Sequence, residues 1–187
     1  GRYWLDLAGY ADSEGKRSAD PIRPHSWRYR DYVIRAFNDD KPYDRFLLEQ
    51  IAGDELADYA NAKTITPQLQ DNLVATGFLR MAADGTDGGT PDAAVAKNQV
   101  VSDTIKIVSS SLLGMSVGCA RCHDHKFDPI STEDYYALAG VFKSTTTMES
   151  FKTIAKWHET EIASEQDQAN YKTAAALIDT KTAELKT

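Results

Sequence analysis

The chain contains only two cysteines, Cys119 and Cys122, and His123 follows the second one directly. This spacing predicts a short turn that holds two thiols and an imidazole close together. Apolar residues at steps of four and three lead into the turn, and they are Val101, Ile105, Val108, Leu112 and Met115. Such spacing is typical of an amphipathic helix, so we expect the turn at the end of a packed helix, with Met115 in the core.

Two cysteines separated by two residues and followed by histidine form the attachment pattern of c-type haem. In this interpretation Cys119 and Cys122 form thioether bonds to neighbouring vinyl groups of one haem c. His123 then places its imidazole under the iron as the axial ligand. The motif therefore predicts one covalently bound haem.

Two other interpretations of the motif stay open. Cys119, Cys122, His123 and His125 offer two sulfurs and two nitrogens to a structural zinc ion. Zinc fingers usually place their ligand pairs on separated segments, whereas these four residues would close almost no loop. A disulfide or a redox pair of thiols is the third interpretation, but it leaves His123 without a role and the chain lacks a βαβ pattern. The haem interpretation is favoured.

The iron needs a second axial ligand or an open position opposite His123. His25 and Met81 are the candidates, because each lies at the end of an expected helix. His125 is too close, since two residues of extended chain span at most ~7 Å. We therefore assign His125, with Arg121 and Lys126, to a supporting role around the haem, for example in binding a propionate.

Helical spacing and capping residues predict an all-α fold, an irregular multi-helix haem-binding domain. Helices are expected over residues 3–10, 26–37, 42–51, 66–79, 101–115 and 131–142. Ser131 and Asp134 have the spacing of a capping box at the start of the last helix. Residues 11–22 and 83–92 are expected to be loops, and the acids of the second loop do not match a calcium-binding EF-hand.

The domain boundary is expected at residue 150. Residues 1–150 form the helical c-type haem domain, and residues 151–187 form a polar helical extension or linker that begins a longer polypeptide. A thin apolar stripe on this extension is typical of a coiled-coil-like helix that pairs with a partner, and it consists of Tyr171, Ala174, Ile178 and Leu185.

Charge and hydropathy restrict the class of partner. The chain has 28 acidic and 21 basic residues, with a net charge of −7, whereas a nucleic-acid-binding domain carries a basic face. No apolar run approaches the ~20 residues that a membrane-spanning helix needs. Covalent haem is attached outside the cytoplasm, so we expect an extracytoplasmic protein, periplasmic or secreted, whose export signal has been removed or lies upstream.

Several segments between residue 3 and about residue 145 match one family pattern. They read WLDLA at 4–8, YAD at 10–12, WRYRDYVI at 27–34, AFN at 36–38, PYDRF at 42–46, EQIAGD at 49–54, ATGF at 75–78 and GCARCHDHKFDPI at 118–130. Together they resemble the planctomycete-type cytochrome c domain family, and the last segment is the most specific. The resemblance implies a module of a large exported polypeptide, beside further domains of unknown function. It implies no established activity.

Three functions of different class follow. The first is a single-haem electron-transfer module that exchanges electrons with a redox partner protein or with neighbouring domains. The second is a haem-dependent oxidative or peroxidatic enzyme domain that acts on extracellular substrates. The third is a non-haem metal-binding structural module. The sequence shows no nucleophilic triad, phosphate loop or paired catalytic carboxylates, so whether the chain is an enzyme stays open.

Overall fold

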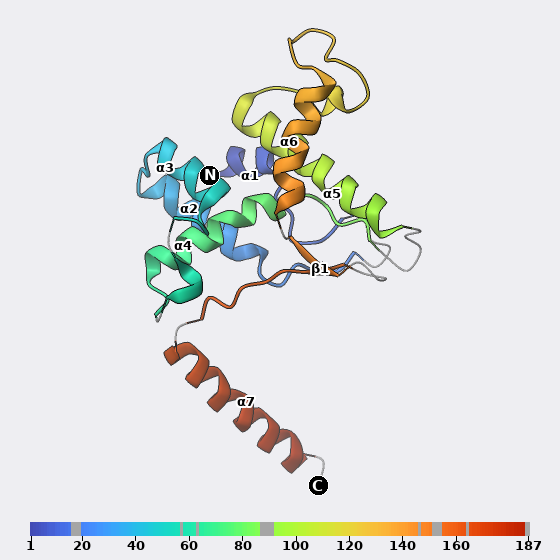
Figure 1. The fold of residues 1–187 in the computed structure, drawn as a ribbon. Coiled ribbons are helices and arrows are strands. Elements are labelled where there is room, and N and C mark those ends of the chain that lie inside the picture. Colours follow the sequence, from blue (N-terminus) through green and yellow to red (C-terminus); the bar gives the residue numbers. More distant parts are fainter. Residues whose placement is uncertain are drawn as a thin grey trace.

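The computed structural model describes residues 1–15, 20–56, 58–62, 64–86, 92–145, 147–150, 155–163 and 165–185. Most of the described chain is helical, and the expected all-α class is confirmed (Figure 1). Residues 87–91 of the second expected loop and residues 151–154 of the expected extension lie outside the described part. No helix in the described ranges is long and apolar enough to cross a bilayer.

Short helices joined by tight turns build the domain. The α-helices are α1 Arg2–Ala8, α2 Ser26–Asn38, α3 Tyr43–Ala52, α4 Pro67–Ala75, α5 Ala93–Val108, α6 Thr132–Ser144 and α7 Glu165–Leu185. The 3₁₀ turns are η1 Tyr59–Asn61, η2 Thr76–Arg80 and η4 Val117–Arg121, and the π-turn is η3 Ser109–Leu113. The two strands are β1 Met148–Ser150 and β2 Lys156–Trp157, which pair antiparallel.

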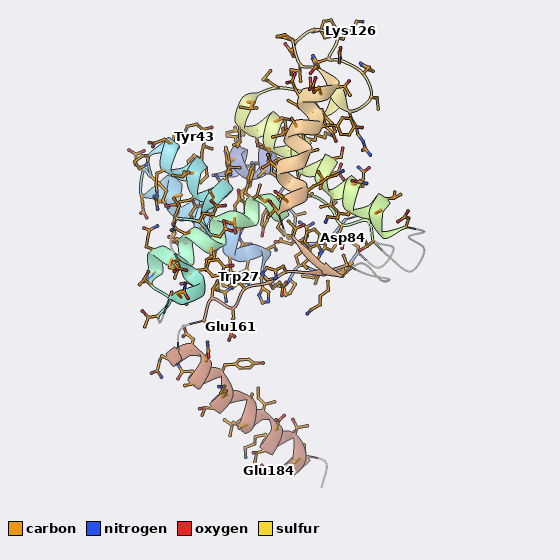
Figure 2. All side chains as sticks on the ribbon, viewed as in Figure 1. Trp27, Tyr43, Asp84, Lys126, Glu161 and Glu184 are labelled. Carbon is orange, nitrogen blue, oxygen red and sulfur yellow. The ribbon has the colours of Figure 1, made fainter. Side chains whose placement is uncertain are left out.

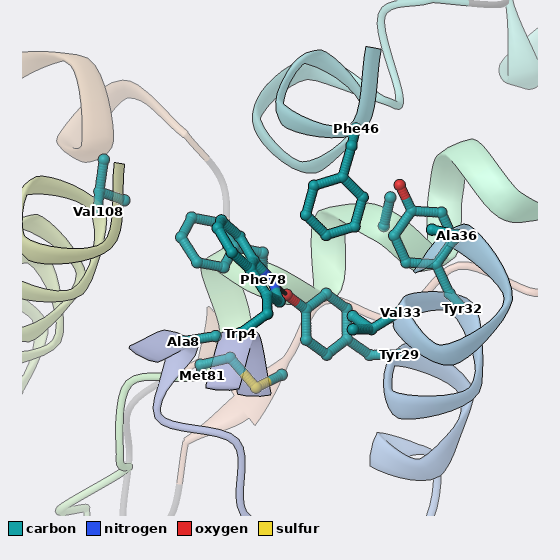
Figure 3. Packing of buried hydrophobic residues seen from close by; sticks show 11 residues of the cluster. Trp4, Ala8, Tyr29, Tyr32, Val33, Ala36, Phe46, Phe78, Met81 and Val108 are labelled. Carbon is teal, nitrogen blue, oxygen red and sulfur yellow. Dashed lines mark hydrogen bonds between the residues drawn. The ribbon is translucent and has the colours of Figure 1, made fainter. Parts of the chain in front are cut away.

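The N-terminal half packs around a first cluster rich in aromatic rings (Figure 3). The members of this first cluster are Trp4, Ala8, Tyr29, Tyr32, Val33, Ala36, Phe46, Ala75, Phe78, Met81 and Val108. The polar tips of Trp4, Tyr29 and Tyr32 form hydrogen bonds with one another or with the buried side chains of Gln50 and Glu49. The Trp4 indole donates to Tyr29 Oη at 2.9 Å and to Gln50 Oε1 at 3.1 Å, so α1, α2 and α3 share one buried hydrogen-bond network.

Glu49 is a charged residue inside this half, and its side chain is only 1 % exposed. Its carboxylate accepts hydrogen bonds from Lys41 Nζ at 2.5 Å, Arg45 Nε at 2.8 Å and Tyr32 Oη at 2.8 Å. Burial raises the pKa of Glu49, but the hydrogen bonds from Lys41, Arg45 and Tyr32 outweigh it and hold that pKa below its usual value. The buried charge is therefore paired and connects α2 with α3.

Helix α5 links the first cluster to a second one. The second cluster consists of Val101, Ile105, Val117, Ala120, Tyr135 and Ala139. Because α5 places Val108 in the first cluster and Val101 and Ile105 in the second, it forms a wall shared by both. The turn η4 and helix α6 pack on its second half, and this arrangement positions the cysteine motif.

The helix expected over residues 101–115 is present, but its two ends differ from the expectation. It begins earlier, at Ala93, and after Val108 it widens into the π-turn η3. The hydroxyl of Ser111 donates to the Ile107 carbonyl at 2.6 Å, and those of the two preceding serines bond carbonyls in the same way. Side-chain bonds of this kind compete with the helical ladder and widen the last turn. Gly114 then ends it with φ of 63°, a left-handed conformation that suits glycine.

The packed part of the chain extends past the expected boundary at residue 150. Ala155 packs with Ala82 and Val100, and the Trp157 indole donates to Asp84 Oδ2 at 3.1 Å. The Arg80 guanidinium lies 3.1 Å from the centre of the Trp157 ring. The two short strands, which the sequence pattern did not predict, hold this return segment against the domain.

Helix α7 extends away from the helical domain (Figure 1). Its apolar residues Tyr171, Ile178 and Leu185 are 75 %, 63 % and 88 % exposed. The expected helical extension is therefore present, and its apolar stripe faces solvent in the chain described by the structure.

We expect Glu49→Gln to lower the free energy of unfolding by about 2–3 kcal/mol, because it removes a buried charge bonded to two cations. Urea unfolding monitored by circular dichroism measures this change. The stabilisation by the Glu49 carboxylate is fully present above the usual pKa of glutamate, and it is lost as the pH falls through the lowered pKa of Glu49 in the folded state. The difference between wild type and variant should therefore shrink on acidification. Asp71→Asn, which breaks a more exposed ion pair with Arg35, should cost below about 1 kcal/mol.

Gly53 and Gly140 provide a matched test of the packing. A Cβ at Gly53 would meet the carbonyl oxygens of Asn72 and Glu49, so Gly53→Ala should destabilise the fold by about 3 kcal/mol. A Cβ at Gly140 would meet nothing within 4 Å. Gly140→Ala should therefore stabilise α6 by about 0.5–1 kcal/mol, because alanine favours helix. Equal effects in urea unfolding would contradict the close approach of α3 and α4.

Candidate functional site

The turn η4 orients the two cysteines. It is a 3₁₀ turn, in which residues three apart lie on the same side. Val117 and Ala120 form the inner side and are buried in the second cluster. Cys119 and Cys122 are also three apart, and both are exposed and free rather than joined in a disulfide. The local fold therefore leaves both thiols accessible at the surface.

His123 follows on the exposed side of the same turn. Its Nδ1 lies 2.7 Å from the carbonyl oxygen of Asp124. A carbonyl oxygen only accepts hydrogen bonds, so Nδ1 carries the proton and Nε2 carries the lone pair. This is the tautomer of a metal-binding histidine whose other ring nitrogen donates to a backbone carbonyl.

His125 has the opposite arrangement, and its side chain is only 6 % exposed. Its Nδ1 accepts the amide N–H of Asp128 at 2.9 Å, so Nε2 carries the proton and donates to Ser116 Oγ at 2.9 Å. The Asp128 carboxylate lies 3.2 Å from Nδ1, but the amide hydrogen already points at this nitrogen. Both ring nitrogens are engaged, so His125 holds the loop after the motif to the residue before η4.

The other expected supporting residues differ in their surroundings. Arg121 Nη1 donates to Ser102 Oγ at 3.0 Å and to Gln99 Oε1 at 3.3 Å, so this side chain fixes η4 to α5. Lys126 is exposed at the tip of the loop (Figure 2), with its Nζ 5.3 Å from the centre of the Phe127 ring. Of the two, Lys126 is the side chain directed to solvent.

The structure does not place either expected second ligand beside the cysteines. Met81 is 5 % exposed and packs in the first cluster with Trp4 and Phe78 (Figure 3). His25 is exposed and precedes α2. Trp27, two residues later, lies on the opposite side of the domain from Lys126 (Figure 2).

A groove with a volume of about 400 Å³ adjoins Cys119. Helix α5 and the turn η3 form one wall, and the chain from Gly114 to Cys119 forms the other. Lys106 and Met115 line it. Cys119 lines this groove, whereas Cys122 and His123 are exposed outside its lining, and the three donors together are of the types that a covalently held haem uses. Within the described ranges, no three His, Cys, Asp or Glu side chains gather as a group that could hold a metal ion.

Ser116 is a site residue that the sequence patterns did not predict, and they did not predict the partner of Asp124 either. Ser116 bonds His125, and Asp124 Oδ1 accepts the amide N–H of Thr132 at 2.8 Å, which ties the loop to the start of α6. Asp124 lies eight residues before Thr132, so capping rules based on nearby residues do not identify this contact. The capping box of Ser131 and Asp134 is confirmed beside it.

We expect His125→Ala to loosen the loop without unfolding the domain. The amides of Phe127 and Asp128 lose their shared acceptor on Nδ1, so their hydrogen exchange should become faster. The free energy of local opening should fall by about 1–2 kcal/mol, the cost of a lost hydrogen bond inside the loop. Phe127→Ala is the control, because that ring is 83 % exposed. Unchanged exchange in His125→Ala would contradict the role of the imidazole.

Comparison with known proteins identifies one family. The model of the PSCyt2 family, described as "Protein of unknown function (DUF1549)", matches residues 1–147. No curated protein matches the chain, and no solved structure matches it. The family name is related to planctomycete cytochrome c, in agreement with the resemblance seen in the sequence. The match covers the cysteine motif and most of the chain, and the chain therefore belongs to the PSCyt2 family.

Proposed function

We propose that this chain is an extracytoplasmic c-type haem protein, the single-haem electron-transfer module of a larger secreted protein. Cys119 and Cys122 would hold one haem c through thioether bonds, and Nε2 of His123 would bind its iron. When bound, haem supplies an iron that takes up and returns one electron. Lys106 lines the adjoining groove and is a cation suited to pair with a propionate.

The observation that carries the proposal is the shared exposure of three donor groups within one turn. Cys119 in η4 and Cys122 directly after it carry exposed thiols, and the adjacent His123 keeps a lone pair on Nε2 because its Nδ1–H donates to a carbonyl. A thiol adds to a vinyl group only if it is accessible and not oxidised to a disulfide. A histidine binds iron only through an unprotonated nitrogen.

Electron transfer is favoured over oxidative catalysis by the exposure of the site. Haem enzymes that activate oxygen or peroxide surround the reacting face with a pocket that controls access. The motif instead lies at one end of the domain, with Cys119, Cys122 and His123 exposed. An exposed edge lets a redox partner protein or a neighbouring domain approach the group closely.

The alternative of a structural zinc site receives less support from the geometry. That site needs His125 as its fourth ligand, but both nitrogens of this ring are already bonded to Ser116 and to the loop backbone. Ligation would break the bonds that order residues 125–130. Haem uses only the thiols and His123, and leaves those bonds in place.

The helix α7 supports a place within a larger assembly. Its exposed apolar stripe needs a covering surface, either a second helix or a neighbouring domain of the same polypeptide. The net charge of −7 in turn favours protein partners over nucleic acid.

The haem is tested by producing the chain with an export signal in a bacterium that matures c-type cytochromes. The intact mass should show one covalently added haem, and the pyridine haemochrome spectrum should show thioether linkage. Replacing Cys119 and Cys122 with Ala should abolish covalent haem, whereas His123→Ala should change the spectrum of the attached group. A mass without haem, or with a single bound zinc ion, would contradict the proposal.

Binding of cyanide or carbon monoxide to the purified haem protein then distinguishes an electron-transfer module from an oxidative enzyme. An electron-transfer module has two strong axial ligands, so both small ligands should bind slowly and weakly. Rapid, tight binding would instead favour the oxidative enzyme. His25→Ala serves as a surface control, because that residue is exposed and distant from the motif.

A further inference from the structure

The groove beside Cys119 contains a donor that the motif does not include. The thioether of Met115 lines the same groove as Cys119, four residues ahead of it in the chain. Methionine sulfur is a soft ligand that binds haem iron, and a histidine–methionine pair raises its reduction potential. Met115 is only half-buried, because it contacts the second cluster while it also faces the groove. Part of the Met115 side chain is therefore accessible from the groove.

The backbone around Met115 holds the residue in place. Gly114 turns the chain with φ of 63°, and the amide of Met115 donates to the Ser109 carbonyl at 3.1 Å. This bond closes the π-turn η3, so the position of Met115 is set by the serine-rich end of α5. The side chain is consequently held on the wall of the groove that faces α5 and not on a free loop.

Apart from Met115, no methionine or histidine in the described part of the chain is found among the residues that line this groove. Met81 is buried in the first cluster, and His25 is exposed two residues before Trp27, which lies on the opposite side of the domain from Lys126 (Figure 2). His158 lies beyond β2, where its amide donates to the Thr147 carbonyl at 3.0 Å. His125 has both ring nitrogens bonded. Among these candidates, Met115 alone shares the groove with Cys119.

The chain length from Met115 to the motif is sufficient for a ligand on the second face. Met115 is eight positions from His123 in the chain, whereas His125 is two positions away and can span at most ~7 Å. Met115 precedes the thioether anchors and His123 follows them. The two donors can therefore reach opposite faces of a group attached between them.

We propose that the sulfur of Met115 is the second axial ligand of the haem iron, opposite His123. This inference rests on the proposed function, because it needs a haem on Cys119 and Cys122. It replaces His25 and Met81 as candidates and identifies the site as a histidine–methionine centre. Such a centre has no open position for a substrate, in agreement with electron transfer.

The test uses the haem-loaded chain and its Met115→Leu and Met81→Leu variants, compared by near-infrared magnetic circular dichroism of the ferric form. Wild type and Met81→Leu should show the sulfur-to-iron charge-transfer band, and Met115→Leu should lose it. Met115→Leu should also have a lower reduction potential and bind carbon monoxide readily in the ferrous form. Met115→His should remain low-spin but lose the band. Thermal unfolding checks that each variant is folded.

The outcomes separate this inference from the proposed function. If covalent haem is absent from wild type, the proposed function fails and this inference fails with it. If haem is attached but the band is absent, or persists in Met115→Leu, Met115 is not the ligand and the haem assignment stands. Loss of the band in Met81→Leu with retention in Met115→Leu would assign the ligand to Met81 instead.

Discussion

Burial of α5 against two hydrophobic clusters is the interaction on which the site depends. The helix contributes Val108 to the aromatic cluster of the N-terminal half and Ile105 to the cluster beneath the cysteine turn. Because one rigid helix belongs to both, the turn η4 has a defined position relative to the whole domain. Arg121 adds polar contacts from the turn to the same helix. The cysteines are therefore exposed without being mobile parts of a free loop.

The two histidines of the motif show how backbone groups set side-chain chemistry. His123 meets a carbonyl oxygen, which forces the proton onto Nδ1, whereas His125 meets an amide N–H, which forces it onto Nε2. The first ring is left with a lone pair directed away from its partner. The second ring is used entirely within the loop. Residues of the same type two positions apart thus differ: His123 keeps a ring nitrogen available, and His125 acts as a structural support.

Charged residues of the N-terminal half serve the fold and not the site. Arg45 pairs with the buried Glu49, Arg30 pairs with Asp31, and Arg35 joins α2 to α4 through Asp71. These three arginines are therefore used in salt bridges within the N-terminal half. Lysine and methionine in the groove beside Cys119 are better placed for contact with a bound group.

Patterns over short distances in the sequence predicted much of this protein correctly. The all-α class, the helix leading into the motif, the capping box at Ser131 and the outward helical extension depend on residues three to seven apart, which local sterics and hydrogen bonds govern. The π-turn after Val108 was not predicted, because it depends on serine hydroxyls that compete with backbone amides for helix carbonyls. The short pair of strands was not predicted either, because its segment is held by contacts with Asp84 and Ala82, which are distant in the sequence.

The candidate haem ligands likewise divide into those that local spacing identified and those that only tertiary packing distinguishes. Spacing alone singled out Cys119, Cys122 and His123 as the proposed attachment site, because haem attachment requires that spacing. Spacing favoured His25 and Met81 as second ligands and placed Met115 in the core, but all three lie near helix ends, so local pattern gave no means of testing that order. Packing separates them by burying Met81 in the aromatic cluster, leaving His25 on a distant surface and setting Met115 on the groove wall. Long-range burial, which no local pattern encodes, makes that distinction.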